Sequence, residues 1–165
     1  GWWRIVEYSV YRWIIVENLN IMLIGEYTHT IDPKKRISIP SKFRKELGKK
    51  AVVTRGLDNC LFVYTLAEWA KVAKKLSELP LGQSQARNFA RIMLSGAVDA
   101  DLDSLGRVLV PDYLKEYADL TNKVVITGVY NRLEIWNEKY WNEYKGKIEK
   151  QTDILAEKLG ELGIL

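Results

Sequence analysis

The feature that most constrains the fold is a nine-residue motif that occurs twice, 71 residues apart. The first copy spans residues 32–40 and the second spans residues 103–111, and both have the pattern D-x-x-x-R-x-x-x-P. Flanking residues match at the same offset, and after one added residue the match continues to Trp69 and Trp141. A chain that repeats itself over this length is a duplication, so its two halves should fold alike.

Each motif has the pattern of two short strands joined by a tight turn. Apolar residues alternate before the Asp and after the Arg, and turn formers and charges stand between them. Pro33 suits the first corner of a turn, and Gly106 can take the positive φ that a tight reversal requires. Asp32 and Asp103 are predicted to orient the turns by bonding backbone N–H groups or the Arg four residues on. A purely structural ion pair is the competing interpretation.

The rest of the chain alternates short helices with hairpins, which predicts an α+β fold. A capping box at Thr65 and Glu68 begins one helix, which ends at Pro80. Asn137 begins a last helix that runs long, because its apolar residues keep an approximate heptad to Leu162. The other expected elements are helices at 41–47, 83–94 and from 112, and hairpins at 51–64 and 124–136.

Composition describes a soluble globular chain of 165 residues with a net charge of +4. The single cysteine, Cys60, excludes an internal disulfide framework, fits a reducing cytoplasm and lies in an apolar run that predicts burial. Residues 1–21 are rich in aromatic and branched residues, and charges interrupt them too often for a signal peptide or a membrane span. An upstream extension of the reading frame and an added element lying on the body of the protein remain open for them.

The run from Met22 to Arg44, MLIGEYTHTIDPKKRISIPSKFR, together with the second motif and residues 91–96, resembles the MraZ family of bacterial regulators. The resemblance covers about residues 22–145. It implies two AbrB-like swapped-hairpin β-barrel halves with flanking helices, in which the strands of each half pair with the other half. It also implies subunits that assemble into a closed homo-oligomeric ring. Lys35 departs from the family, which usually has glycine at this place.

The repeat and the resemblance together predict four segments. Residues 1–21 form an N-terminal extension, and residues 22–82 form the first AbrB-like repeat with its helix. Residues 83–145 contain the connecting helix and the second repeat, and residues 146–165 form a C-terminal helical tail.

The two copies differ in charge. Residues 34–55 contain nine basic residues and one acidic residue, a net charge of +8, whereas residues 105–127 contain three of each. A duplicated fold with only one basic copy indicates a phosphate-facing surface on that copy, with the second copy mainly as scaffold. A solvated face balanced by acidic residues elsewhere is the alternative.

Arg36 is the strongest candidate for reading a base, since a guanidinium can bond O6 and N7 of guanine together in the major groove. Lys34 and Lys35 are expected to contact phosphates or bases beside it. The resemblance implies that Arg107 also faces DNA, but its neutral surroundings in the sequence make it the weaker candidate.

Catalytic chemistry has no support in the sequence. His29 has no nucleophile or metal-ligand partner marked by a motif, and there is no P-loop, no G-x-G-x-x-G and no C-x-x-C. We therefore expect no enzyme activity, cofactor, metal, small-molecule substrate or membrane attachment.

The predicted function is a cytoplasmic, nucleoid-associated transcriptional regulator that binds double-stranded DNA. By resemblance, it would recognise tandem short G-containing repeats upstream of the division and cell-wall gene cluster, through the basic hairpin of the first repeat. The alternative is an oligomeric protein-interaction module such as an AbrB-like antitoxin. A helical, heptad-patterned C-terminus disfavours this alternative, since antitoxin tails are usually disordered and acidic.

Overall fold

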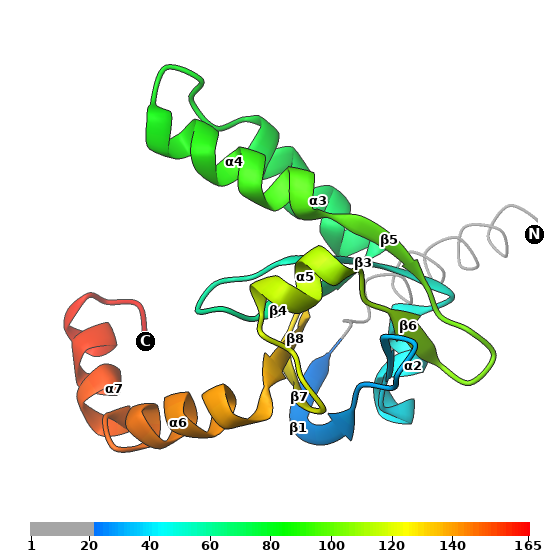
Figure 1. Ribbon diagram of the computed structural model, residues 1–165. Coiled ribbons are helices and arrows are strands. Elements are labelled where there is room, and N and C mark those ends of the chain that lie inside the picture. Colours follow the sequence, from blue (N-terminus) through cyan, green and yellow to red (C-terminus); the bar gives the residue numbers. More distant parts are fainter. Residues whose placement is uncertain (1–21) are drawn as a thin grey trace, which may run out of the picture.

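The computed structural model describes residues 22–165, and this part of the chain contains eight strands and six helices (Figure 1). The expectations for residues 1–21 lie outside the described residues. The strands are β1 (Leu23–Thr30), β2 (Arg36–Ser38), β3 (Lys50–Arg55), β4 (Leu61–Thr65), β5 (Val98–Asp101), β6 (Arg107–Leu109), β7 (Lys123–Tyr130) and β8 (Leu133–Asn137). The helices are α2 (Ser41–Leu47), α3 (Leu66–Ser77), α4 (Ser84–Gly96), α5 (Asp112–Tyr117), α6 (Glu138–Glu149) and α7 (Thr152–Glu161).

The strands form a six-stranded antiparallel sheet and a separate two-stranded ribbon. The sheet has the order β1-β7-β8-β4-β3-β5, and the ribbon pairs β2 with β6. Four pairings join one copy of the repeat to the other: β1 with β7, β2 with β6, β3 with β5 and β4 with β8. The predicted α+β class and the exchange of strands between the halves are therefore confirmed. Closure into a barrel and assembly into a ring stay predictions.

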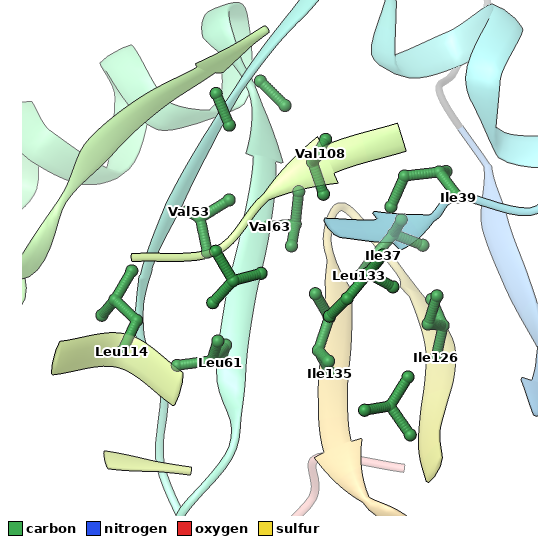
Figure 2. Close-up of a cluster of buried hydrophobic side chains, with 14 of the residues drawn as sticks. Ile37, Ile39, Val53, Leu61, Val63, Val108, Leu114, Ile126, Leu133 and Ile135 are labelled. Carbon is green, nitrogen blue, oxygen red and sulfur yellow. The ribbon is translucent and has the colours of Figure 1, made fainter. Parts of the chain in front are cut away.

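The main hydrophobic core lies between the sheet and the ribbon (Figure 2). Ile37 of β2 and Val108 of β6 are partners at the centre of the ribbon, and both are fully buried. They belong to one cluster with residues of the sheet and of α2 and α5, among them Val63, Leu133 and Leu114. Both copies supply this core, so neither copy can bury its apolar residues without the other.

A second hydrophobic cluster covers the opposite face of the sheet. Helices α3, α4 and α6 contribute to it, and Trp69 packs on Tyr64 while Trp141 packs on Trp136, with ring centroids 5.7 and 5.2 Å apart. Every residue of β4 and β8 is consequently buried. Strands covered on both faces lose the alternation of apolar and polar residues that a half-exposed strand shows.

The end of the chain differs from the prediction of one long helix. Two helices, α6 and α7, are separated at Lys150 and Gln151. The hydroxyl of Thr152 donates to the carbonyls of Ile148 and Glu149, and the N–H of Gln151 bonds Ile148 three residues back, a pattern that interrupts an α-helix. The heptad leucines Leu155 and Leu159 of α7 belong to neither hydrophobic cluster of residues 22–165, and Leu162, just after the helix, is 71% exposed.

The two copies approach each other closely where β1 pairs with β7. Gly25 and Gly128 are partners there, and a Cβ atom on Gly128 would lie 2.5 Å from the carbonyl carbon of Leu23 and 2.6 Å from the nitrogen of Ile24. Backbone atoms of a paired strand cannot move aside as a flexible side chain can. Gly128 therefore sets how closely the two copies approach.

We predict that Gly128→Ala lowers the free energy of unfolding by about 1–3 kcal/mol, the usual range for overpacking. Gly146→Ala is the matched control, because a Cβ atom there meets nothing within 4 Å inside α6. The control should raise stability by roughly 0.5–1 kcal/mol through helix propensity. Urea unfolding measures both variants, and equal midpoints would contradict the proposed close approach.

Candidate nucleic-acid interface

The outer face of the ribbon carries an arginine from each copy of the motif. Successive side chains of a strand point to opposite faces, so burial of Ile37 and Val108 turns their neighbours outward. Arg36 lies directly across from Leu109, and Arg107 lies directly across from Ser38. The two arginines are therefore diagonal neighbours on one face, although 71 positions separate them in the sequence.

The same network of hydrogen bonds holds the turn of each motif. In the first, Oδ1 of Asp32 accepts the backbone N–H of Arg36 at 2.9 Å and Oδ2 accepts its Nε at 2.9 Å. In the second, Asp103 accepts the corresponding groups of Arg107 at 2.9 and 2.7 Å. The hydrogen bonds predicted for D-x-x-x-R are thus present in both copies. They fit the turn-orienting role of the two aspartates.

These bonds also favour the ionised form of both carboxylates. The backbone N–H of Arg36, followed by its guanidinium, lowers the pKa of Asp32 below its usual value, and Arg107 does the same for the pKa of Asp103. Within the described residues, the Nη groups of the two arginines make no hydrogen bond, and the side chains are 30% and 25% exposed. Each guanidinium is oriented through Nε while its outer nitrogens can bind a ligand.

Lys35 takes the backbone conformation of the glycine that it replaces. Its φ is 62°, and Gly106 at the equivalent place in the second motif has a φ of 73°. The Nζ of Lys35 forms an ion pair with Asp112 at 2.5 Å, so this turn contacts the first residue of α5 in the other copy. The first turn therefore keeps the left-handed backbone conformation although a lysine stands where the family usually has glycine.

Each copy places a charged side chain beside the turn of the other copy's motif. Helix α2 of the first copy follows β2 and reaches the turn of the second motif, where the Arg44 side chain lies against Gly106. Nε of Arg44 donates to the carbonyl of Ile39 at 2.7 Å, which fixes this position. Arg107 therefore has a cationic residue of the first copy beside its turn. Arg107 was the weaker candidate because its neighbours in the sequence are neutral in sum, but its neighbours in the folded chain include this cation.

Residue-by-residue reasoning missed Arg44 and Leu109 as parts of this surface. Arg44 was counted in the charge of the first copy, and its place beside the second motif depends on strand exchange. Leu109 is 57% exposed on the outer face of the ribbon. Pairing the two motifs with each other in the correct register would have identified both residues.

No competing catalytic site is apparent in the part of the chain that the structure describes. His29 is half-buried on β1, and burial together with the charge of Arg44 lowers its pKa, which keeps it neutral at pH 7. Cys60 is buried, and its burial raises the pKa of the thiol well above the ordinary value.

Residues 22–165 contain no group of three or more His, Cys, Asp or Glu side chains placed to hold a metal ion. In the same range, no helix has the length and apolar character to cross a bilayer.

We predict that Lys35→Gly is more stable than Lys35→Ala by about 1 kcal/mol, because only glycine takes a positive φ without steric cost. Both substitutions remove the same ion pair with Asp112, so the comparison isolates backbone strain. The midpoint of urea unfolding is the measurement. Indistinguishable midpoints would show that the first turn stores no strain at Lys35.

Comparison with known proteins agrees with this architecture. The family model described as "MraZ protein, putative antitoxin-like" matches twice, over residues 22–92 and 93–160. Among curated proteins, the chain is 49% identical to the transcriptional regulator MraZ of Moorella thermoacetica over 143 aligned residues. The alignment covers 87% of this chain and all of that relative. The chain is 48% identical over 143 residues to the protein of the same name from Thermoanaerobacter pseudethanolicus, with the same coverage.

A third relative, the transcriptional regulator MraZ of Caldanaerobacter subterraneus subsp. tengcongensis, is 49% identical over 140 residues, which are 85% of this chain and 95% of the relative. Two consecutive matches to the family model agree with the two copies seen in the strand pairing. The chain belongs to the MraZ family.

Proposed function

We propose that this protein is a DNA-binding transcriptional regulator whose β2–β6 ribbon enters the major groove. One observation carries the proposal: Arg36 and Arg107 lie on the same outer face of a two-stranded ribbon, and a carboxylate holds each in place. The major groove admits a two-stranded ribbon, and arginine is the side chain that most often reads guanine there. The relatives carry the name transcriptional regulator, which supports the same conclusion.

The surrounding cations would position the ribbon on the phosphates. Lys34 and Lys35 directly precede Arg36, and Arg44 stands at the turn that precedes Arg107. Contacts of this kind supply affinity and register, while base contacts supply sequence preference. Asp32 and Asp103 would stay away from the phosphates, because their oxygens are engaged with their own arginines.

We further propose that several subunits act together as a closed ring on tandem G-containing repeats. Exposed apolar residues on two separate surfaces support assembly: Phe89 and Ile92 on α4, and Leu155 and Leu159 on α7. Contact between two different surfaces of adjacent subunits is heterologous and closes into a ring at a suitable rotation. The operator upstream of the division and cell-wall genes and a location in the cytoplasm at the nucleoid follow from the family resemblance alone.

An oligomeric protein-interaction module remains the second candidate. The exposed leucines of α7 and the word antitoxin-like in the description of the family model favour it. In that function the basic ribbon is secondary, so it leaves the two oriented arginines unexplained. We therefore rank DNA binding first.

Because the two arginines have equivalent bonds and neighbouring cations, we predict that Arg36→Ala and Arg107→Ala each weaken specific DNA binding by about 1–3 kcal/mol. Lys147→Ala is the control, since it removes an exposed charge of the same sign from α6. Binding is measured by gel shift with DNA from upstream of the gene of this protein, and melting temperatures verify folding. A loss confined to Arg36 would restore the view that the second copy is mainly scaffold. Unchanged binding in both variants would contradict DNA recognition by the ribbon.

We also predict that binding depends on the spacing of the DNA repeats. One ribbon alone would leave affinity near the non-specific range of about 10⁻⁴ to 10⁻⁶ M, whereas linked ribbons gain through effective concentration when repeat and subunit spacing match. Inserting half a helical turn between repeats, or deleting one repeat, should weaken binding far more than proportionally. Titration of such a spacer series, with the oligomer size measured by light scattering, is the test. A single repeat bound as tightly as the full set would exclude the multivalent mechanism.

A further inference from the structure

The outer face of the ribbon is symmetric in its backbone but not in its side chains. Under the 71-residue repeat, Arg36 is equivalent to Arg107, and Ser38 is equivalent to Leu109. The arginines match, whereas the other pair has a hydroxyl in one copy and an isobutyl group in the other. Antiparallel pairing then places Leu109 across from Arg36 and Ser38 across from Arg107. Each end of the ribbon therefore presents a different pair of side chains.

Leu109 is not part of either hydrophobic cluster in residues 22–165. Its side chain is 57% exposed, although its neighbours Val108 and Val110 are fully buried. A single exposed leucine is ordinary on a protein surface. This one, however, stands directly across the strand pair from an arginine that we propose reads guanine.

The spacing across the ribbon suits neighbouring bases. Directly opposite residues on antiparallel strands have Cβ atoms about 4.5–5.5 Å apart. Successive bases along a DNA strand are about 3.4 Å apart. Side chains at positions 36 and 109 would thus reach base pairs one or two steps from each other.

The chemistry of the major groove gives the two ends of the ribbon, at Leu109 and at Ser38, preferences for different bases. Thymine alone presents a methyl group there, and apolar side chains contact it, whereas a serine hydroxyl bonds several bases. We propose that Leu109 contacts the C5-methyl group of a thymine one or two base pairs from the guanine read by Arg36. Each bound repeat is then asymmetric, and the ribbon lies on it in one orientation. This inference rests on the proposed function.

The test uses the full chain and a duplex enriched from a random DNA pool by binding to it. Each thymine of the enriched repeat is replaced in turn by deoxyuridine, which lacks only the methyl group. For the wild-type protein, one position should weaken binding about fourfold, the effect of burying one methyl group. Leu109→Ser should remove that difference and leave the dependence on the guanine intact.

Leu105→Ser is the matched control, because Leu105 is also an exposed leucine of the second motif but lies in the turn rather than in the ribbon. It should keep the deoxyuridine effect. The double variant Ser38→Leu, Leu109→Ser should move the methyl-sensitive position to the other side of the repeat. Melting temperatures should stay within a few degrees of the wild-type value, since the substituted side chains contribute little to the core.

The outcomes separate this inference from the function beneath it. If the pool yields a specific duplex but no thymine is sensitive, or sensitivity survives Leu109→Ser, the inference is overturned while DNA recognition stands. If Leu109→Ser changes the oligomer size and the sensitivity to deoxyuridine is retained, the proposed contact with thymine is overturned too. Leu109 is then assigned to a contact between subunits. If no specific duplex is enriched, the proposed function and this inference fail together.

Discussion

The exchange of strands between the two copies is the constraint on which the rest of the structure depends. Ile37 and Val108 meet at the centre of the ribbon, and both are fully buried against a sheet that also contains strands of both copies. An isolated two-stranded ribbon is marginal in water, so its stability comes from the sheet beneath it. Folding of the core and formation of the candidate DNA surface are consequently one event.

The aspartate–arginine pairs serve orientation more than stability. They are partly exposed, and exposed ion pairs contribute little to the free energy of folding. What they provide is a guanidinium held through Nε with its outer nitrogens available, so less side-chain freedom is lost when a ligand binds. Repeating the device in both copies places two oriented arginines on one surface. A duplicated chain therefore presents both oriented arginines from one subunit, whereas two separate hairpin chains would first have to associate.

The sequence alone predicted the duplication, the α+β class and the bonds within each motif. These features are local, or follow from the self-similarity of the chain, so residue type and spacing are sufficient to predict them. The pairing of each half with the other came from the family resemblance. The prediction of one long C-terminal helix was wrong. The heptad pattern continues through Gln151 and Thr152, but local hydrogen bonds there separate α6 from α7.

Only the tertiary structure decided how the candidate site is composed. Counting charge along the chain assigned a basic surface to the first copy, yet strand exchange places Arg44 beside the second motif and Asp112 beside the first. The same exchange sets Leu109 across from Arg36. Such neighbours are about 70 positions apart, and no local pattern encodes which register two strands adopt; the burial of Ile37 and Val108 on one face determines it.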